Sequence, residues 1–375
     1  MSRAAAWAST DCSGPDARLA RVAPPGRFAR KLRQHMRGRG RPGARWIAVA
    51  AIAVAAIVGP AALLAYTGVF ESAGSAAPAQ TSTPVFAPRA PAQGGIPLGP
   101  PKLPKALYGD VFTGTKLALT PETAVEELNA ARLKAMRVFV ILVGAQKHYR
   151  NEDGTFDLDS WKSVVDEFRD VDLSEFVVDG TIVAHQLVSE SKARAQWGGS
   201  VIPNNVLDEM ARYSKEIWPT MPTVLRTDPS DLEEHAAAFG TPWPGWRWSY
   251  LDAASARYLT RKGSVEAFAA TEQASATRQR LALVAGLNVL SGGDGSSEIG
   301  SPRPGAWAMS PDELLRYGRA LLLGTSACAF ELWRYESPGS EFENVVYFRR
   351  PEISEALREL AAIASQRPQR ACRLK

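Results

Sequence analysis

The chain has few residues of the kinds that hold metals, build disulfide frameworks or cradle phosphates. It carries 3 cysteines and 4 histidines in 375 residues, and Cys12, Cys328 and Cys372 are too widely spaced for a CxxC or Cys/His zinc motif. We expect no disulfide framework, and Cys328 should be a small buried apolar residue. A P-loop, a dinucleotide-binding glycine motif and a G-x-S-x-G nucleophile elbow are also absent from the sequence. No metal site and no cofactor are therefore expected.

Basic charge is concentrated in the N-terminal head. Residues 1–45 hold 11 of the 44 Lys and Arg residues but 2 of the 39 Asp and Glu residues, whereas the rest of the chain holds 33 and 37. Binding of nucleic-acid phosphates requires a clustered basic face. The mildly acidic remainder of the chain therefore gives no indication of a nucleic-acid partner.

An uncharged apolar run follows this head. Residues 47–66 carry no charged side chain, and their number matches the roughly 20 residues that a helix needs to cross a bilayer. The arginine-rich flank at residues 37–45 predicts a cytoplasmic N-terminus and an extracytoplasmic C-terminal part. We expect a disordered head at 1–45 and a single-pass signal anchor at 46–67 in the cell membrane. The alternative is a signal peptide cut near residues 75–77, which would yield a secreted protein.

The remainder divides into a linker and a folded part. Residues 68–104 are rich in Ala, Pro, Gly, Ser and Thr, a composition that cannot bury a core and predicts a disordered linker. Residues 105–367 alternate between apolar runs typical of strands and amphipathic helical patterns, before a short tail at 368–375. Strict alternation favours a parallel sheet, and the size of the segment favours a (β/α)8 TIM barrel. The alternative, an open doubly wound sheet, usually carries a glycine-rich phosphate loop that is missing here.

Seven strands can be assigned, and the eighth is open. The expected strands are Leu107–Phe112, Val138–Val143, Thr181–Val188, Thr223–Thr227, Trp246–Ala253, Leu287–Ser291 and Ala327–Tyr335, with Val345–Phe348 as a candidate for the eighth. The expected helices are Pro121–Ala135, Leu158–Phe168, Val206–Ile217, Asp231–Phe239, Ser264–Ala285, Pro311–Leu323 and Glu352–Ser365. In a TIM barrel the carboxyl ends of the strands form the ligand-binding face, so ionisable groups at those ends are the candidates for chemistry.

The expected strand at residues 181–188 runs into polar residues at its carboxyl end. Glu190 follows it directly and is the first candidate catalytic residue, as a general acid/base. The alternative is a loop carboxylate that pairs with Lys192 or Arg194. His185, on the same strand, is a candidate substrate-binding residue, although a lone histidine in a strand is more often a satisfied core residue.

A ladder of aromatic residues leads to a second carboxylate. Trp246, Trp248, Tyr250 and Asp252 share one face of a strand by period two. We expect Asp252 to be catalytic, with Trp248 and Tyr250 binding sugar. The alternative is that the rings belong to the core and that Asp252 caps a helix at residues 253–258.

The last expected strand points a third carboxylate inward. By period two, Glu331, Trp333 and Tyr335 lie on the face that turns into the barrel. Glu331 is a catalytic candidate and the two aromatic residues are candidates for sugar binding. Because a buried carboxylate needs a partner, Glu331 is otherwise expected to form a structural ion pair with Arg226 or Arg137.

Two segments carry a resemblance to a known family. They are Gly154-Thr-Phe-Asp-Leu-Asp-Ser-Trp-Lys-Ser-Val-Val-Asp-Glu-Phe168 and Asp179-Gly-Thr-Ile-Val-Ala-His-Gln-Leu-Val-Ser-Glu190, with shorter matches at 210–215, 218–219, 250–252 and 286–290. Residues 105–367 resemble the glycoside-hydrolase-like TIM-barrel proteins of bacteria, which implies a carbohydrate-active barrel. Members of that family end the second segment in Asp-Glu-Pro, where this chain has Ser189, Glu190 and Ser191.

These patterns predict a membrane-anchored extracytoplasmic barrel that hydrolyses or binds a cell-wall or environmental polysaccharide or oligosaccharide. Hydrolysis requires two carboxyl groups, one protonated and one acting as nucleophile or base. Asp294, after two glycines, is a further ligand-binding candidate or an ordinary turn residue. Because Ser189 replaces the acid of the family triplet, a catalytically inactive carbohydrate-binding protein is the alternative. A scaffold for interactions in the cell envelope is the third hypothesis.

Overall fold

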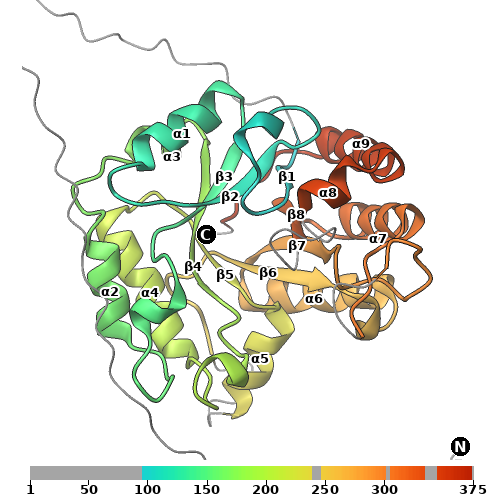
Figure 1. Ribbon diagram of the computed structural model, residues 1–375. Helices are drawn as coiled ribbons and strands as arrows, with labels where there is room; N and C mark the ends of the chain where they lie inside the picture. The colour runs from blue at the N-terminus through green and yellow to red at the C-terminus, as the bar shows by residue number, and fades with distance from the viewer. Residues whose placement is uncertain (1–94, 239–245, 301–304, 334–343, 374–375) are drawn as a thin grey trace, which may run out of the picture. The chain divides into compact units, whose positions relative to one another are not determined.

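A computed structural model describes residues 95–238, 246–300, 305–333 and 344–373, which form a (β/α)8 TIM barrel (Figure 1). All neighbouring strands are parallel, in the order β1-β8-β7-β6-β5-β4-β3-β2. The strands are β1 (Leu98–Gly99), β2 (Gly114–Ala118), β3 (Arg137–Ile141), β4 (Ile182–Ser189), β5 (Thr223–Arg226), β6 (Ala253–Tyr258), β7 (Ala282–Asn288) and β8 (Ala329–Trp333).

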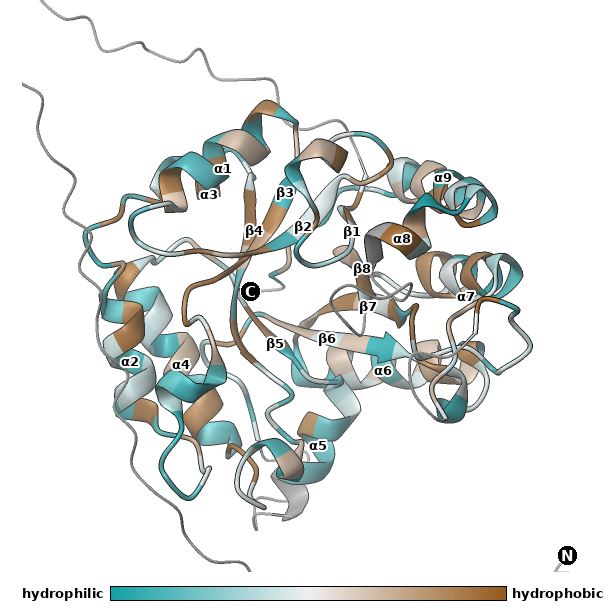
Figure 2. Cartoon of the chain, viewed as in Figure 1, coloured by the Kyte–Doolittle hydropathy of each residue, from teal (hydrophilic) through white to brown (hydrophobic). Residues whose placement is uncertain are grey.

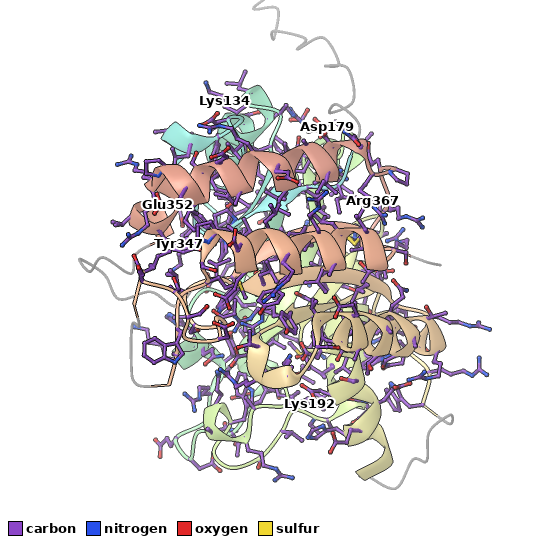
Figure 3. All side chains as sticks on the ribbon, turned by 90° about the vertical axis from the view of Figure 1, so that its right-hand side faces the viewer. Lys134, Asp179, Lys192, Tyr347, Glu352 and Arg367 are labelled. Atoms are coloured by element: carbon purple, nitrogen blue, oxygen red, sulfur yellow. A yellow bond between two sulfur atoms is a disulfide. The ribbon has the colours of Figure 1, made fainter. Side chains whose placement is uncertain are left out.

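Helices surround the strands, as Figure 1 shows. They are α1 (Ala124–Leu133), α2 (Leu158–Asp166), α3 (Ser174–Val178), α4 (Asn204–Ile217), α5 (Pro229–Ala238), α6 (Val265–Gln279), α7 (Pro311–Gly324), α8 (Asn344–Arg349) and α9 (Pro351–Gln366). Figure 3 shows α9, α7 and α6 side by side along one flank of the barrel. Ser310 caps α7 in a capping box with Glu313, which satisfies free backbone N–H groups at that helix end.

The barrel closes between its shortest strand and β2. Gly99 pairs with Glu331 on one side, and a parallel bridge joins Pro101 to Lys116 on the other. A Cβ atom on Gly99 would lie 1.9 Å from the carbonyl oxygen of Gly114, so only glycine permits this approach. β1 lies within the segment expected to be a linker, so that from residue 95 onward this segment belongs to the barrel.

The interior of the barrel is apolar at the amino ends of the strands and becomes charged toward their carboxyl ends. The apolar cluster consists of Phe139, Val183, Ala184, Val224, Ala253, Ala282, Val284, Cys328, Ala329 and Cys372. Above it, the ammonium of Lys116 lies 5.8 Å from the ring centre of Phe139 and pairs with Glu331 at 2.7 Å. In Figure 2 the strands are largely hydrophobic, and β6 turns hydrophilic at its carboxyl end. Polar groups are therefore directed to one end of the barrel.

The amino end of the barrel is tied to the C-terminal segment by a disulfide bond. Cys328, just before β8, is bonded to Cys372, with 5.3 Å between the Cα atoms. The expectation that Cys328 is only a small apolar residue is therefore incomplete, because their separation of 44 positions hides the proximity of the two cysteines in the sequence. Both residues are buried within the interior apolar cluster.

The strand expected at Trp246–Ala253 is the main error in the sequence analysis of the fold. The strand is β6, and it begins where the expected one ends. The expected helix at residues 253–258 is likewise wrong, because those residues are β6 itself. Alanine favours helix in isolation, but four of the six β6 residues are small and fit the crowded barrel wall.

Other boundaries moved for related reasons. The helix expected at Ser264–Ala285 ends at Gln279, because Arg280 takes a left-handed conformation with φ 57° and the chain then enters β7. Residues 107–112 form only a turn and one bridge, and the strand lies further on, at β2. Residues 345–348, the candidate eighth strand, lie in helix α8.

The strand expected at Leu287–Ser291 is β7, which begins five residues earlier, at Ala282. The other expected strands and helices lie within three residues of the observed ones. Among the residues that the structure describes, no helix has the length and apolar character needed to span a bilayer. The expected head and signal anchor, and most of the expected linker, lie outside those residues.

Candidate functional site

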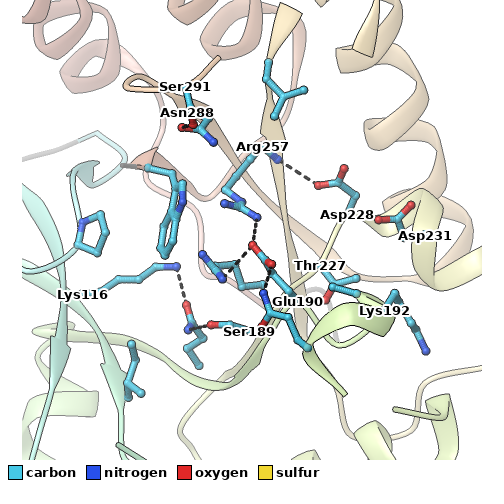
Figure 4. Close-up of a pocket in the computed structure, with 18 of the residues that line it drawn as sticks. Lys116, Ser189, Glu190, Lys192, Thr227, Asp228, Asp231, Arg257, Asn288 and Ser291 are labelled. Atoms are coloured by element: carbon cyan, nitrogen blue, oxygen red, sulfur yellow. Dashed lines mark hydrogen bonds and ion pairs between the residues drawn. The ribbon is translucent and has the colours of Figure 1, made fainter. Parts of the chain in front are cut away.

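A cleft of about 830 Å³ opens at the carboxyl ends of the strands (Figure 4). Residues at the ends of β2 to β8 contribute to it, as do two residues that follow β1. Its lining consists of Pro101, Lys102, Lys116, Ala118, Ile141, Gln186, Ser189, Glu190, Lys192, Ala193, Gln196, Arg226, Thr227, Asp228, Asp231, His235, Arg257, Leu259, Arg261, Lys262, Asn288, Ser291 and Trp333. The cleft therefore occupies the position where TIM barrels bind ligands.

Glu190 lies in the middle of the labelled cleft residues, directly after β4 (Figure 4). Its Oε1 atom pairs with Arg257 at 2.9 Å and with Arg226 at 3.1 Å, and its Oε2 atom accepts a 2.5 Å hydrogen bond from Gln196. Its backbone is left-handed, with φ 52°, a conformation that is uncommon outside glycine and costs free energy. The surrounding contacts hold this carboxylate in place against that cost.

The surroundings of Glu190 keep it ionised. Burial raises the pKa of its carboxyl group, but the charges of Arg226 and Arg257 together lower it by more, so the pKa lies below its ordinary value. A general acid needs the opposite shift. The lowered pKa therefore favours the ionised carboxylate of Glu190, and its predicted acid/base role stays a prediction.

The ring of Trp333 lies close to three basic side chains of the cleft. The guanidinium carbon of Arg226 lies 3.7 Å from the ring centre of Trp333, that of Arg257 lies 4.8 Å away, and the Lys116 ammonium lies 5.8 Å away. Such distances allow cation–π attraction. Trp333 therefore lines the cleft, with three basic side chains within cation–π distance of its ring. Its predicted sugar-binding role stays a prediction.

An ion pair lies at the inner end of the cleft. Lys116 contacts Glu331 at 2.7 Å and donates a 2.5 Å hydrogen bond to Gln186, while Ser255 donates to the other oxygen of Glu331 at 3.2 Å. Burial lowers the pKa of Lys116 to about 8. Burial raises the pKa of Glu331, but Lys116, Arg257 and Arg226 together lower it below its ordinary value. Glu331 points inward as predicted, yet its partner is Lys116 instead of Arg226 or Arg137, and it lies below the residues that line the cleft.

Two further carboxylates approach the cleft from the end of β5 and the start of α5. Asp228 accepts hydrogen bonds from Lys262 and, at 3.2 Å, from the backbone N–H of Arg257. Burial and then the nearby charge of Asp228 raise the pKa of Asp231. Lys192 is buried near Asp231, and burial lowers its pKa to about 7. The cleft therefore contains one carboxyl group whose pKa is lowered, Glu190, and one whose pKa is raised, Asp231.

Asp252, the predicted second catalytic carboxylate, lies at the opposite end of the barrel. It precedes β6, and its carboxylate contacts Lys215 at 2.5 Å and Arg373 at 3.3 Å. Trp248 is buried and donates a 3.0 Å hydrogen bond to Gln279, while Tyr250 is exposed, just before Asp252. The alternating aromatic residues have the period of a strand, but β6 begins only after them. The prediction therefore placed all three residues at the carboxyl end of the barrel, where they do not lie.

The remaining predicted residues lie away from the cleft. His185 is fully buried, shares a 2.9 Å hydrogen bond with Ser214, and lies between the rings of Trp161 and Trp218. Burial lowers its pKa to about 3, so it is a neutral core residue. Asp294 accepts a 2.8 Å hydrogen bond from the backbone N–H two residues on, which is the turn alternative. Tyr335 lies outside the described residues.

The basic residues of the cleft and the carboxyl group of Asp231 were not predicted from the sequence as site residues. The expected strand at residues 223–227 ends in Arg226 and Thr227 and is followed by Asp228, a signal of the same kind as the one that identified Glu190. Lys116 and Arg257 were missed because β2 and β6 were misplaced. In the described part of the chain, no group of three or more His, Cys, Asp or Glu residues is arranged to hold a metal ion.

Comparison with known proteins gives no match in sequence: neither a family model nor a curated protein matches the chain. Among solved structures, a xylanase from Paenibacillus barcinonensis matches at 9% identity and TM-score 0.43, over 70% of this chain and 92% of the other. A GH113 β-1,4-mannanase matches at 10% identity and TM-score 0.44, over 72% and 99%. A β-glucuronidase from an uncultured Clostridium species matches at 11% identity and TM-score 0.46, over 72% and 50%.

The barrel resembles those of glycoside hydrolases. These similarities are distant in sequence and low in TM-score, and they identify neither the activity nor the substrate of this chain.

Proposed function

We propose that the chain is a glycoside-hydrolase-like protein that binds a polysaccharide or oligosaccharide in this cleft and hydrolyses it. The observation that carries the proposal is the pair of carboxyl groups with opposite pKa shifts, Glu190 and Asp231, in one cleft at the carboxyl ends of the strands. Divergent pKa values in one site are the arrangement that acid/base chemistry requires.

The proposed roles follow from the opposite directions of the two pKa shifts. Asp231, with its raised pKa, is the candidate proton donor to the leaving oxygen of the glycosidic bond. Glu190, held ionised by two arginines, is the candidate nucleophile, or the base that activates water. Trp333 offers an aromatic surface beside Glu190's two arginine partners for the apolar face of a sugar ring.

The proposal includes an extracytoplasmic location, with the barrel tethered through an N-terminal membrane anchor at residues 46–67. The uncharged run and its arginine-rich flank support it. The bond between Cys328 and Cys372 is a second, independent support, because disulfides persist in oxidising compartments and are rare in the cytosol.

The test is sugar release from a panel of neutral and acidic polysaccharides by the purified full-length protein. Glu190→Gln and Asp231→Asn should each lower kcat/KM by about 10²–10⁴-fold, since each removes one catalytic proton function. Glu355→Gln on the outer helix α9 is the matched control and should have no effect, because this glutamate is exposed and far from the cleft lining. Wild-type turnover by either cleft variant would remove that residue from the mechanism.

Binding without hydrolysis is the second candidate function. It is favoured by the contacts of Glu190, because both of its carboxylate oxygens are already engaged by Arg226, Arg257 and Gln196. A carboxylate so occupied is hindered as a nucleophile. Retention of glycans by the wild-type protein, with no sugar released, would identify this function and exclude the hydrolytic one.

A further inference from the structure

The charge of the cleft differs in sign from that of the rest of the folded part. Seven basic side chains and three carboxylates line it. Outside the N-terminal head, by contrast, the chain carries 37 acidic and 33 basic residues. Basic residues are therefore gathered into the cleft of a chain segment that is otherwise mildly acidic.

The carboxylates of the cleft do not neutralise these cations. Glu190 is shared by two arginines, Arg226 and Arg257, and Asp228 is paired with Lys262. Lys116 is matched from below by Glu331. These pairings leave an excess of positive charge on the wall that faces a ligand.

Two arginines of the cleft, Arg226 and Arg261, have N–H groups that can donate hydrogen bonds to a ligand. Arg226 is 5% exposed, and its Nε and Nη1 atoms have no hydrogen-bond partner within the described ranges. Arg261 is exposed on the rim, in the short turn Thr260–Lys262, and no ion pair involving it is found among the described residues. Buried donors without a partner cost free energy, which a suitable ligand would recover.

We infer that the cleft selects anionic sugar units, such as uronates or sulfated sugars, over neutral ones. The inference depends on the proposed glycan-binding function and specifies its substrate class. A neutral sugar would leave the excess cations unmatched, whereas a carboxylate or sulfate would pair with them, and the planar guanidinium group suits both anions. Opposite charge on a cleft wall also raises the encounter rate and the selectivity for charged ligands.

The test compares ligands that differ only in charge. Binding of the full-length protein would be measured with oligogalacturonides and with the same oligomers after reduction of their carboxyl groups. A sulfated galactan and its desulfated form, which is neutral because the polymer has no carboxylates, provide the matching pair for sulfate. The acidic member of at least one pair should bind at least about tenfold more tightly at low ionic strength, and this preference should shrink as salt screens the charges.

A charge reversal on the rim tests the same inference from the protein side. Arg261→Glu should weaken binding of the preferred acidic oligomer by about fivefold, because it replaces an attractive charge with a repulsive one at the edge of the cleft. Arg358→Glu, on the exposed side of α9, changes the net charge equally and should leave binding unchanged. The comparison of the two separates a local effect from that of overall charge.

The outcomes distinguish the inference from the function on which it rests. Equal or tighter binding of the neutral member in both pairs would overturn the anionic preference and leave glycan binding standing. Equal effects of Arg261→Glu and Arg358→Glu would also overturn it. Failure of every glycan to bind would overturn the proposed function, and the inference with it.

Discussion

The two ends of the barrel each hold a carboxylate between two cations, yet they differ in what that cluster can do. At the carboxyl end, Glu190 pairs with Arg226 and Arg257 and lines the cleft of about 830 Å³. At the amino end, Asp252 pairs with Lys215 and Arg373.

Access separates the two clusters. The Glu190 side chain is 28% exposed, whereas that of Asp252 is 3% exposed and also accepts hydrogen bonds from the backbone and hydroxyl of Thr223. A saturated, buried carboxylate stabilises the junction of elements around it, while an accessible one beside a cavity can meet a ligand. A strand-end carboxylate is therefore informative only when the end of the strand is known.

The largest loss of stability is expected at the ion pair of Lys116 and Glu331, which lies between the two ends of the barrel. Lys116→Met would leave Glu331 as a buried charge without its lysine partner and should lower the free energy of unfolding by about 3–5 kcal/mol. Urea unfolding followed by tryptophan fluorescence would measure the loss. The double variant Lys116→Met/Glu331→Leu is the control and should recover most of it. If the single and the double variant had the same free energy of unfolding, the unpaired charge of Glu331 would not be the cause of the loss.

The amino end should matter for stability alone. Cys328→Ala/Cys372→Ala removes the disulfide and should lower the free energy of unfolding by about 2–4 kcal/mol. Glycan binding well below the melting temperature should stay unchanged, because the bond lies away from the cleft lining. Cys12→Ala, in the N-terminal head, is the control and should change neither quantity. Loss of glycan binding in the folded double variant would show that the two ends are coupled.

How far the sequence predicts the molecule depends on the local pattern of each strand. The apolar runs of β3, β4 and β5 are followed by clear breaks, so these strands were located within a residue or two, and Glu190 with them. The alanine-rich stretches before β7 and within β6 satisfy helix and strand patterns equally, and burial in the barrel decides between them.

The partners in the site could not be predicted in the same way. Period two correctly turned Glu331 and Trp333 inward, because that alternation is a local property of a strand. The pairing of Lys116 with Glu331 joins residues 215 positions apart, across the short strand β1 that lies between β8 and β2. The Cys328–Cys372 bond depends on how the C-terminal segment returns beneath the barrel. Such contacts follow from the closed topology, which no local pattern contains.

His185, buried in the wall of the barrel, should affect the pH dependence of stability and not the cleft. Burial lowers its pKa to about 3, so the folded protein keeps it neutral while the unfolded chain takes up a proton below about pH 6.5. Stability is therefore full above pH 6.5 and should fall on acidification, by up to about 1.4 kcal/mol per pH unit. Urea unfolding between pH 7 and 5 would measure this slope. His185→Gln should flatten it, and an unchanged slope in that variant would assign the effect to other groups.

The smallest expected effect concerns the strain at the cleft. Glu190→Gly and Glu190→Ala both remove the carboxylate, but only glycine adopts the left-handed backbone at φ 52° without cost. The glycine variant should therefore be more stable than the alanine variant by about 1 kcal/mol. Ala135→Gly, at φ 54° in the loop after α1, measures the gain in stability that glycine gives at a left-handed position away from the cleft. If the difference at Glu190 greatly exceeded that at Ala135, the cleft would hold strain beyond the backbone conformation itself. If alanine matched glycine at residue 190, the loop would relax once its carboxylate contacts were lost, and those contacts would be the cause of the left-handed turn.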